Sequence, residues 1–531
     1  MGWNTWNAVG CNPSSGLVQR SADIIASSGM KAAGYQYVVV DDCWMNPDRD
    51  ANGNLQADAR RFPGGMKAVA DYVHGKGLKF GIYQVPTEKT CAQRAGQLPL
   101  GARGKGTGSL GHEQQDANTF AAWGVDFLKY DWCSPDGDLE QQKQQFTVMR
   151  DALSATGRPI VYSINPNSYH LSKTGATFDW RGIANTWRTT EDITPSWNTG
   201  HTNGYPMGIS NILNIESTAS IADQSGPGHW NDPDMLEVGN GGLSADEQRS
   251  HMAMWAVTAS PLIAGNKLDS MSAEALALLT NPDVVAVDQD PQEGAGRLIR
   301  DKNGLQTWAR RLADGSVAVA LLNQTSGTAT VSTTAGSVGL PYTASYMLKD
   351  VWSGRTTTTA QTISATLASH ASAMYRVTPV GPATSPPAPA DGTYEIASTG
   401  STQVLDDPAF STAPNTQLIS WNRTDGTNQR WTFTANGDGS YAVRNKASGL
   451  CMDIRGAATS AGTAVIQYGC TGRANQRFTP RPLASGGYQL IARNSNLAIT
   501  ASGTVNGSVL TQQEPGTGWP DSQVWALNPA G

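Results

Sequence analysis

Charged side chains are scarce in this 531-residue chain, where they make up 15% of the residues, against about 25% in an average soluble protein. With 38 basic and 44 acidic residues, the formal net charge is -6. No basic block interleaved with aromatic residues occurs, although a nucleic-acid-binding protein needs such a positive surface. We therefore expect no nucleic-acid partner.

Long apolar runs and metal motifs are also missing. No stretch approaches the roughly 18 consecutive apolar residues of a membrane span, and the N-terminus lacks the pattern of a signal peptide. No cysteines form a CxxC pair, and the 7 histidines form no zinc-like cluster. His112 and Glu113 begin no HExxH motif because position 116 is Asp, so we expect a surface pair at a helix start. The sequence predicts no membrane partner, no metal and no cofactor.

Cysteines are few but even in number, and 6 of them are compatible with three disulfides. Six buried free thiols in an intracellular protein are the alternative that the count leaves open. We favour a secreted, extracellular chain from which the signal peptide has been removed.

The length implies two to four domains, since a typical domain has roughly 100 to 200 residues. The clearest boundary is PVGPATSPPAPAD at 379–391, where proline and small residues predict an extended, semi-rigid linker. The residues before it change pattern near 290. We expect a first domain at 1–290, a second at 291–378 and a third at 392–531.

In the first domain, short apolar runs alternate with helical periods. The runs occupy 37–42, 79–83, 125–131, 159–165 and 260–266. Apolar residues recur at helical spacing in two segments. They are Met66, Val69, Ala70 and Val73, and then Phe146, Met149 and Leu153 before Gly157, which could cap the helix end. About eight strand–helix units over this length favour a (β/α)8 TIM barrel, and no GxGxxG supports an open nucleotide-binding sheet.

The remaining domains are rich in β-structure. Alternating apolar and polar residues at 291–378 predict an antiparallel β-sandwich. Beyond the linker, QxW-type triplets begin at Gln429, Gln476 and Gln523, at an interval of 47 residues. Such a repeat predicts a threefold architecture and resembles the ricin-type β-trefoil, a carbohydrate-binding module of family 13.

Polar residues follow the apolar runs of the first domain, where a barrel carries its catalytic groups. They are Asp41, Asp42, Asp131, Asp192, Asp232 and Asp234, together with Lys129 and Arg188, and Trp3, Trp6, Trp44, Trp187 and Trp230 lie near the same ends. Carboxylates, cations and aromatic rings around one opening suit a sugar. A plainer interpretation makes the acids helix caps or salt-bridge partners and the tryptophans core residues.

Six motifs in order, MGWNTWN, VVVDDCW, KFGIYxxxxxKTC, FLKYDWC, WRTTEDI and GPGHWNDPDML, resemble glycoside hydrolase family 27, the α-galactosidase group. The resemblance implies that Asp131 is the nucleophile and Asp192 the general acid/base of a retaining glycosidase. It also implies sugar-binding roles for Trp6, Asp41, Asp42, Tyr83, Lys129, Arg188, Asp234 and Met235. The same resemblance pairs Cys11 with Cys43 and Cys91 with Cys133, and the trefoil module pairs Cys451 with Cys470.

Retaining hydrolysis needs an ionised and a protonated carboxyl group about 5 to 5.5 Å apart. Lys129, two residues before Asp131, would help to keep the nucleophile ionised. Glu191, if it faces the same way as Asp192, would help the acid to keep its proton.

Two segments depart from a usual α-galactosidase: QVPTEKTC at 84–91 and YSINPN at 162–167. With Trp132 after the nucleophile, they resemble the β-L-arabinopyranosidase branch of the same family, so we add Glu88 and Asn165 to the substrate-binding candidates. The leading hypothesis is release of terminal β-L-arabinopyranosyl groups, with weaker α-D-galactosidase activity. A plain α-galactosidase is the alternative. The partner would be an arabinopyranosyl- or galactosyl-terminated oligo- or polysaccharide. A non-catalytic secreted lectin is remote, because it would not need both Asp131 and Asp192.

The trefoil repeats offer two complete sugar sites by the family pattern. The predicted residues are Asp406, Trp421 and Asn428 in the first repeat and Asp453, Tyr468 and Asn475 in the second. The third repeat has Thr500, Pro515 and Ser522 at these positions. Since these residues can neither chelate paired sugar hydroxyls nor stack on a ring, we expect the third repeat to be structural.

Overall fold

The computed structural model describes residues 1–168, 174–198, 215, 218, 221–292, 294–384, 386–483, 486–516 and 521–530. The chain divides into two compact units, Met1–Gly296 and Arg297–Gly531. Within the described ranges, no helix has both the length and the apolar character that crossing a bilayer requires.

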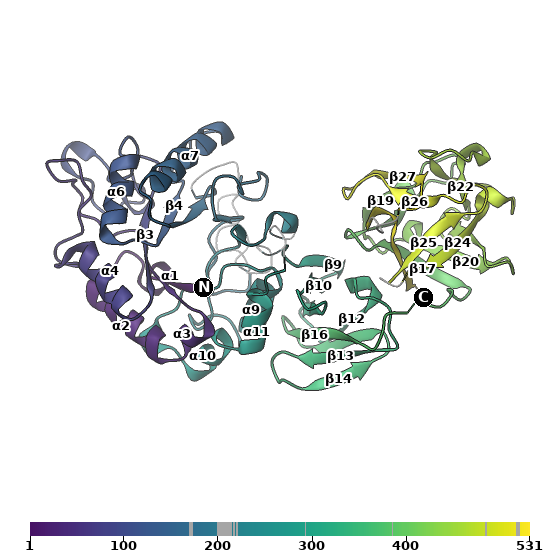
Figure 1. Ribbon diagram of the computed structural model, residues 1–531, viewed down its shortest axis with the longest axis horizontal. Helices are drawn as coiled ribbons and strands as arrows, with labels where there is room; N and C mark the ends of the chain where they lie inside the picture. Colours follow the sequence, from purple (N-terminus) through teal and green to yellow (C-terminus); the bar gives the residue numbers. More distant parts are fainter. Residues whose placement is uncertain are drawn as a thin grey trace. The chain divides into compact units, whose positions relative to one another are not determined.

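The first unit is built on eight parallel strands in the order β7-β6-β5-β4-β3-β2-β1-β8. Their bounds are β1 Gly2–Asn4, β2 Tyr37–Val40, β3 Lys79–Gln84, β4 Phe127–Asp131, β5 Val161–Asn165, β6 Thr186–Arg188, β7 Trp230–Asp232 and β8 Ile263–Ala264. Leu236, just after β7, bridges Ala264 in parallel and closes the ring. Helices surround the strands (Figure 1). The predicted TIM barrel is therefore confirmed.

The helices of this unit begin and end as their sequences dictate. They are α1 Trp6–Val9, α2 Ser15–Ser27, α3 Met30–Ala33, α4 Gly65–Gly75, α5 Cys91–Arg94, α6 Glu113–Trp123, α7 Leu139–Ala155, α9 Ala245–Val257, α10 Ala273–Leu279 and α11 Pro282–Asp288. The predicted apolar face of α4 is buried. Asp138 and Gln141 form a capping box at the start of α7, and Gly157, with φ of 71°, follows its end as a left-handed residue. His112 is the N-cap residue of α6, as predicted.

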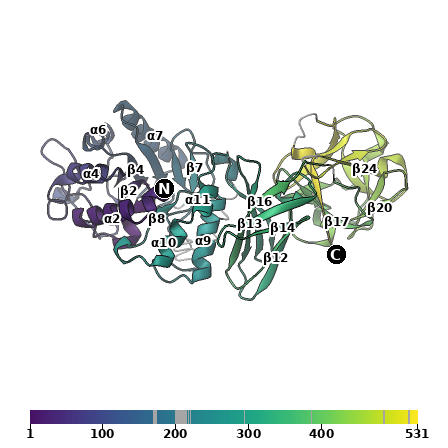
Figure 2. The ribbon, with the colours of Figure 1, turned by 60° about the horizontal axis from the view of Figure 1, so that its bottom comes forward.

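The second unit begins with the predicted antiparallel sandwich (Figure 2). One sheet has the order β14-β13-β16-β11-β10-β9, and the other pairs β12 with β15. The bounds are β9 Arg297–Lys302, β10 Leu305–Arg311, β11 Val317–Asn323, β12 Ala329–Thr334, β13 Ser345–Asp350, β14 Thr356–Thr359, β15 Thr362–Leu367 and β16 Ser372–Val380. β11 is buried along its whole length and contributes Val319 and Leu321 to the core. Between β16 and β17, the described residues of the proline-rich segment form neither helix nor strand.

The trefoil follows with twelve strands among the described residues. They are β17 Gly392–Ser398, β18 Gln403–Asp406, β19 Ile419–Asn422, β20 Trp431–Ala435, β21 Tyr441–Asn445, β22 Cys451–Ile454, β23 Val465–Tyr468, β24 Arg477–Pro482, β25 Tyr488–Ala492, β26 Ala498–Ala501, β27 Ser508–Gln513 and β28 Trp525–Pro529. The aromatic residues of the triplets, Trp431, Phe478 and Trp525, meet in one core. The 47-residue repeat thus reflects three units that bury their aromatic residues together.

Candidate active site

The predicted polar residues of the barrel gather at the carboxyl ends of its strands. Asp41 and Asp42 follow β2, and Asp131 and Arg188 end β4 and β6. The strand registers pair Asp131 with Asn165 and Arg188 with Asp232. Because parallel strands end at one face of a barrel, these side chains surround a single opening.

The predicted nucleophile, Asp131, is only 6% exposed. Burial raises the pKa of its carboxyl to about 7, the cation of Lys129 opposes the rise, and the charges of Asp41 and Asp192 add to it. The Nζ of Lys129 lies 2.8 Å from Oδ2 of Asp41 and 4.0 Å from Oδ2 of Asp131. Burial acts to lower the pKa of Lys129, but Asp131 and Asp41 raise it overall, so the ammonium keeps its charge.

The aspartate pair after β2 is held by donors on both carboxylates. Oδ2 of Asp41 accepts hydrogen bonds from Lys129 at 2.8 Å and from Nδ2 of Asn4 at 2.7 Å. Asp42 accepts from the backbone N–H groups of Cys43 at 2.6 Å and Ala92 at 2.8 Å. Burial nevertheless raises the pKa of Asp42 to about 6. Both acids are therefore fixed in direction before any ligand binds.

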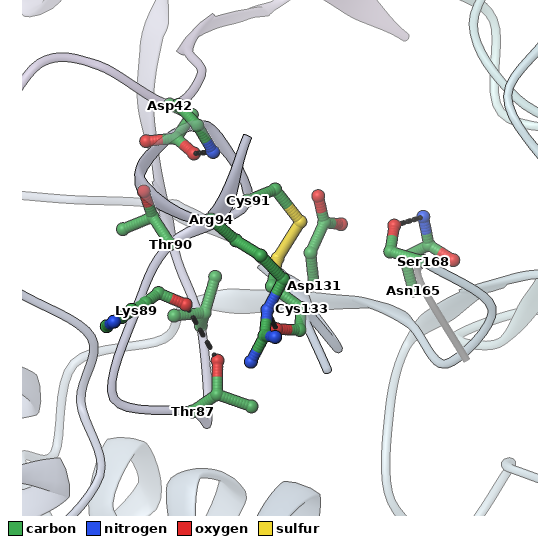
Figure 3. The surroundings of a disulfide bond; sticks show 12 residues. Asp42, Thr87, Lys89, Thr90, Cys91, Arg94, Asp131, Cys133, Asn165 and Ser168 are labelled. Atoms are coloured by element: carbon green, nitrogen blue, oxygen red, sulfur yellow. Dashed lines mark hydrogen bonds between the residues drawn. A yellow bond between two sulfur atoms is a disulfide. The ribbon is translucent and has the colours of Figure 1, made fainter. Parts of the chain in front are cut away.

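All three predicted disulfides are present: Cys11–Cys43, Cys91–Cys133 and Cys451–Cys470. Figure 3 shows that Cys91–Cys133 lies beside Asp131, and its two sulfur atoms and a carboxylate oxygen of Asp131 are within 4.8 Å of one another. Nε of Arg94 donates to the carbonyl of Cys133 at 2.6 Å. This disulfide therefore ties α5, which supplies the backbone N–H for Asp42, to the end of β4, where Asp131 lies.

Across the opening from Asp131, the buried guanidinium of Arg188 forms ion pairs with two acids. Arg188 lies 3.1 Å from Oδ1 of Asp192 and 3.1 Å from Oδ1 of Asp234. The Asp192 side chain is 67% exposed, whereas the adjacent Glu191 is buried. The two side chains therefore lie in different environments, and a role for Glu191 in keeping Asp192 protonated stays a prediction.

Asp234 stands in a strained position with a φ of 96°, which favours glycine over other residues. Its Oδ2 accepts from the N–H of Ile193 at 2.9 Å, and its carbonyl accepts from Nε1 of Trp255 at 2.7 Å. Burial raises the pKa of Asp234 to about 6, and Arg188 opposes that rise. With Met235 and Lys129, it lines a cavity of about 30 Å³, a volume on the scale of one or two water molecules.

The five tryptophans near the strand ends divide into two groups, and three of them agree with the plainer interpretation that they are core residues. Trp3, Trp44 and Trp187 are fully buried in the core. The indole N–H groups of Trp3 and Trp44 donate to backbone carbonyls. Trp6 and Trp230 are half-buried. Large rings next to a strand end fill the barrel as readily as they line its mouth.

The two residues chosen for substrate preference differ in their surroundings, and only Asn165 is among the residues that line the cavity described above. Glu88 is exposed on the loop before the disulfide, which agrees better with a solvated carboxylate than with one enclosed in a pocket. Asn165 is buried, but its Nδ2 donates to Oγ of Ser168 and its Oδ1 accepts from the N–H of Asn167. Figure 3 shows the first of these bonds. The Asn165 amide therefore shapes its own loop.

Tyr83 lies among these groups, buried under the disulfide, with its hydroxyl 3.4 Å from Sγ of Cys133. Asn4, which our sequence analysis missed, holds Asp41. It is the last residue of β1, so the rule that polar residues at strand ends line the site would have found it.

In the trefoil, the first two repeats carry the same polar cluster. Oδ2 of Asp406 accepts from Asn428 at 3.1 Å and from Gln429 at 2.7 Å. Oδ2 of Asp453 accepts from Asn475 at 2.9 Å and from Gln476 at 2.7 Å.

The aromatic partners of these clusters, Trp421 and Tyr468, are 39% and 41% exposed, as a stacking surface requires. In the third repeat, Thr500 donates to a carbonyl of its own strand, and Gln523 donates to the carbonyl of Glu514.

The known proteins that this chain resembles agree with this geometry. Residues 1–290 match the family described as alpha galactosidase A, and residues 302–377 match the alpha galactosidase C-terminal beta sandwich domain. The chain belongs to glycoside hydrolase family 27, the α-galactosidase family. Residues 386–468 and 438–513 match the ricin-type beta-trefoil lectin domain. The protein is therefore a multidomain glycoside hydrolase.

Individual relatives carry two different names. An α-galactosidase of Cyamopsis tetragonoloba is 41% identical over 387 residues, which span 71% of this chain and 86% of that protein. The structure of α-galactosidase I from Mortierella vinacea superposes with a TM-score of 0.65 at 31% identity, covering 72% of this chain and 98% of that one. A β-L-arabinopyranosidase from Geobacillus stearothermophilus gives 0.61 at 26% identity, covering 72% and 96%.

Proposed function

We propose that this glycosidase removes terminal α-D-galactopyranosyl groups with retention of configuration, by way of a covalent intermediate on Asp131. The observation that carries the proposal is the buried Asp131–Lys129–Asp41 group facing the Arg188–Asp192–Asp234 group across one barrel mouth. The names of the relatives support galactose as the sugar. This choice places the α-galactosidase alternative ahead of the arabinopyranosidase that the loops suggested.

In the first step, Asp131 attacks the anomeric carbon while Asp192 gives a proton to the leaving oxygen. Lys129 favours the ionised form of the attacking carboxylate. It also forms an ion pair with Asp41, which, with Asp42, would accept hydrogen bonds from ring hydroxyls. In the second step, Asp192 takes a proton from water, and the hydroxide releases the sugar from Asp131. The exposure of Asp192 suits this role, because both the leaving group and the water approach from solvent.

β-L-arabinopyranoside is the second candidate substrate, and the loop sequences at 84–91 and 162–167 favour it. This sugar has the ring configuration of α-D-galactopyranose without the C6 hydroxymethyl group, so the same carboxylates serve both. Discrimination by one such group is worth roughly 10- to 200-fold.

Nitrophenyl α-D-galactoside and nitrophenyl β-L-arabinopyranoside, assayed side by side, test the proposal. We expect the higher kcat/KM on the galactoside. If kcat/KM is at least about tenfold higher on the arabinopyranoside, the second candidate is the function. If neither glycoside is hydrolysed, both candidate functions are contradicted.

The trefoil would hold the enzyme on a polysaccharide that carries such end groups, through its first two repeats. We also propose that the protein is secreted, since all six cysteines form disulfides and disulfides persist in oxidising compartments.

A further inference from the structure

One buried acid of the barrel has no part in the mechanism above. Glu237 follows β7 and is 1% exposed. Its Oε1 accepts a hydrogen bond from Nδ2 of Asn7, and its Oε2 accepts one from Nδ2 of Asn240 at 2.5 Å. Its backbone N–H donates to Nε2 of His251 at 2.9 Å. A carboxyl group taken out of water needs such partners, because burial without them is costly.

The groups around Glu237 belong to the active site on one side and to the barrel wall on the other. Burial raises the pKa of its carboxyl to about 7, the amides of Asn240 and Asn7 oppose this rise, and Asp234 and Asp192 add to it. On α9, burial lowers the pKa of His251 to about 3, so that ring is neutral. Glu237 thus lies near the proposed catalytic acids but is shielded from the solvent that Asp192 faces.

Asn7 connects Glu237 to the aromatic residue at the mouth of the barrel. It is the second residue of α1, which begins at Trp6 and has only four residues. A single turn of helix has no stability of its own in water. The N–H of Trp6 donates to Oδ1 of Asn4 at 2.7 Å, and Asn4 in turn donates to Asp41. Trp6 is therefore held from one side through Asn4 and from the other through Asn7.

We propose that Glu237 is a positioning residue that fixes Trp6 against the sugar by accepting the hydrogen bond of Asn7. The role rests on the proposed glycosidase site, in which Trp6 is a wall of the sugar pocket. A carboxylate can accept from two amide N–H groups at once. A glutamine at this position would present its own NH2 group to one of those donors, so one of the two bonds would be lost.

The test compares Glu237→Gln with Asn7→Ala on both nitrophenyl glycosides. Loss of a hydrogen bond to a charged group weakens binding by roughly tenfold or more, so KM should rise about tenfold in Asn7→Ala and by up to that factor in Glu237→Gln. Because Trp6 contacts the sugar in ground and transition states alike, kcat should change less than about threefold. The double variant should be no worse than either single one, since both act through one bond. Glu140→Gln, an exposed residue of α7, is the matched control.

An unchanged KM in Asn7→Ala, or effects that add in the double variant, would overturn the positioning role. A loss of kcat with a normal KM would do the same, because it would place Glu237 in the chemistry. Thermal melting shows whether the variants fold, and if Glu237→Gln does not, an unchanged KM in Asn7→Ala is enough to overturn the role. Inactivity of the unaltered enzyme on both glycosides would instead contradict the proposed function and this role with it.

Discussion

The barrel mouth and the trefoil both carry aspartates that we propose to bind sugar, but they hold them in different ways. In the barrel, cations hold the acids: Lys129 lies 2.8 Å from Asp41, and Arg188 lies 3.1 Å from Asp234. In the trefoil, the neutral side-chain amides of Asn428 and Gln429 donate to Asp406. Cations and amides both favour the ionised form of a buried carboxylate, but a hydrogen bond from a charged donor is roughly twice as strong as one from a neutral amide. The first arrangement suits a reaction in which charge moves, and the second suits binding alone.

The largest expected effect comes from removing the negative charge of Asp131, the proposed nucleophile. Asp131→Asn should lower kcat by more than about a thousandfold, because no covalent intermediate can form. Asp192→Asn should keep partial activity on substrates with acidic leaving groups, which need no protonation. Steady-state rates on nitrophenyl and alkyl galactosides measure both. More than a thousandth of the unaltered rate in Asp131→Asn would show that Asp131 is not the nucleophile.

In the trefoil, a change of one aspartate should affect binding only at its own repeat. Asp406→Ala together with Asp453→Ala should weaken binding of the whole protein to galactose- or arabinose-bearing polysaccharide by at least about tenfold, since each change leaves two amides without their acceptor. Affinity electrophoresis measures the effect. Thr500→Ala in the third repeat is the control and should bind normally. Sugar density at the third repeat with the first two empty would reverse the assignment.

The pH dependence of catalysis in the barrel should differ from the pH dependence of polysaccharide binding by the trefoil. Since the pKa of Asp131 is raised to about 7 and its ionised form is the nucleophile, kcat/KM should fall about tenfold for each pH unit below that value. Lys129→Met removes the cation that opposes the rise, so the acid limb should move to higher pH. Polysaccharide binding by the trefoil, measured over the same range, is the internal comparison. An acid limb near pH 4 would contradict a nucleophile whose burial raises its pKa.

The smallest expected effect concerns substrate preference. If Glu88 excludes the C6 hydroxymethyl group, Glu88→Asp, which is one methylene shorter, should raise the galactoside-to-arabinopyranoside ratio of kcat/KM by about tenfold. The ratio is measured with the two nitrophenyl glycosides. Because Glu88 is exposed in the structure, an unchanged ratio is the competing outcome, and it would leave Glu88 as a solvated loop residue.

Sequence reasoning found what depends on periodicity and on strand ends. The run at 125–131 predicted β4 and placed Asp131 at its end, and the 47-residue interval predicted the three trefoil units. It failed where the direction of a side chain decides. Trp3 and Trp44 share the strand ends with true site residues but point into the core. Asn165 ends β5 and lines one cavity with Lys129 and Asp234, but no sequence pattern showed that its amide bonds within its own loop.

The same limit applies to Glu237. Its burial and its bond to Asn7 join residues that are far apart in the chain, and no local spacing in the sequence shows such a contact.

The most direct test of the catalytic account is to trap the intermediate. A galactosyl fluoride with fluorine in place of the 2-hydroxyl slows hydrolysis of the covalent sugar–enzyme bond more than its formation, and peptide mass spectrometry then locates the sugar. The account predicts one sugar per chain on the peptide that contains Asp131, and product galactose of retained anomeric configuration from the normal substrate. A label on any other carboxylate, or release of the inverted anomer with no label at all, would contradict it.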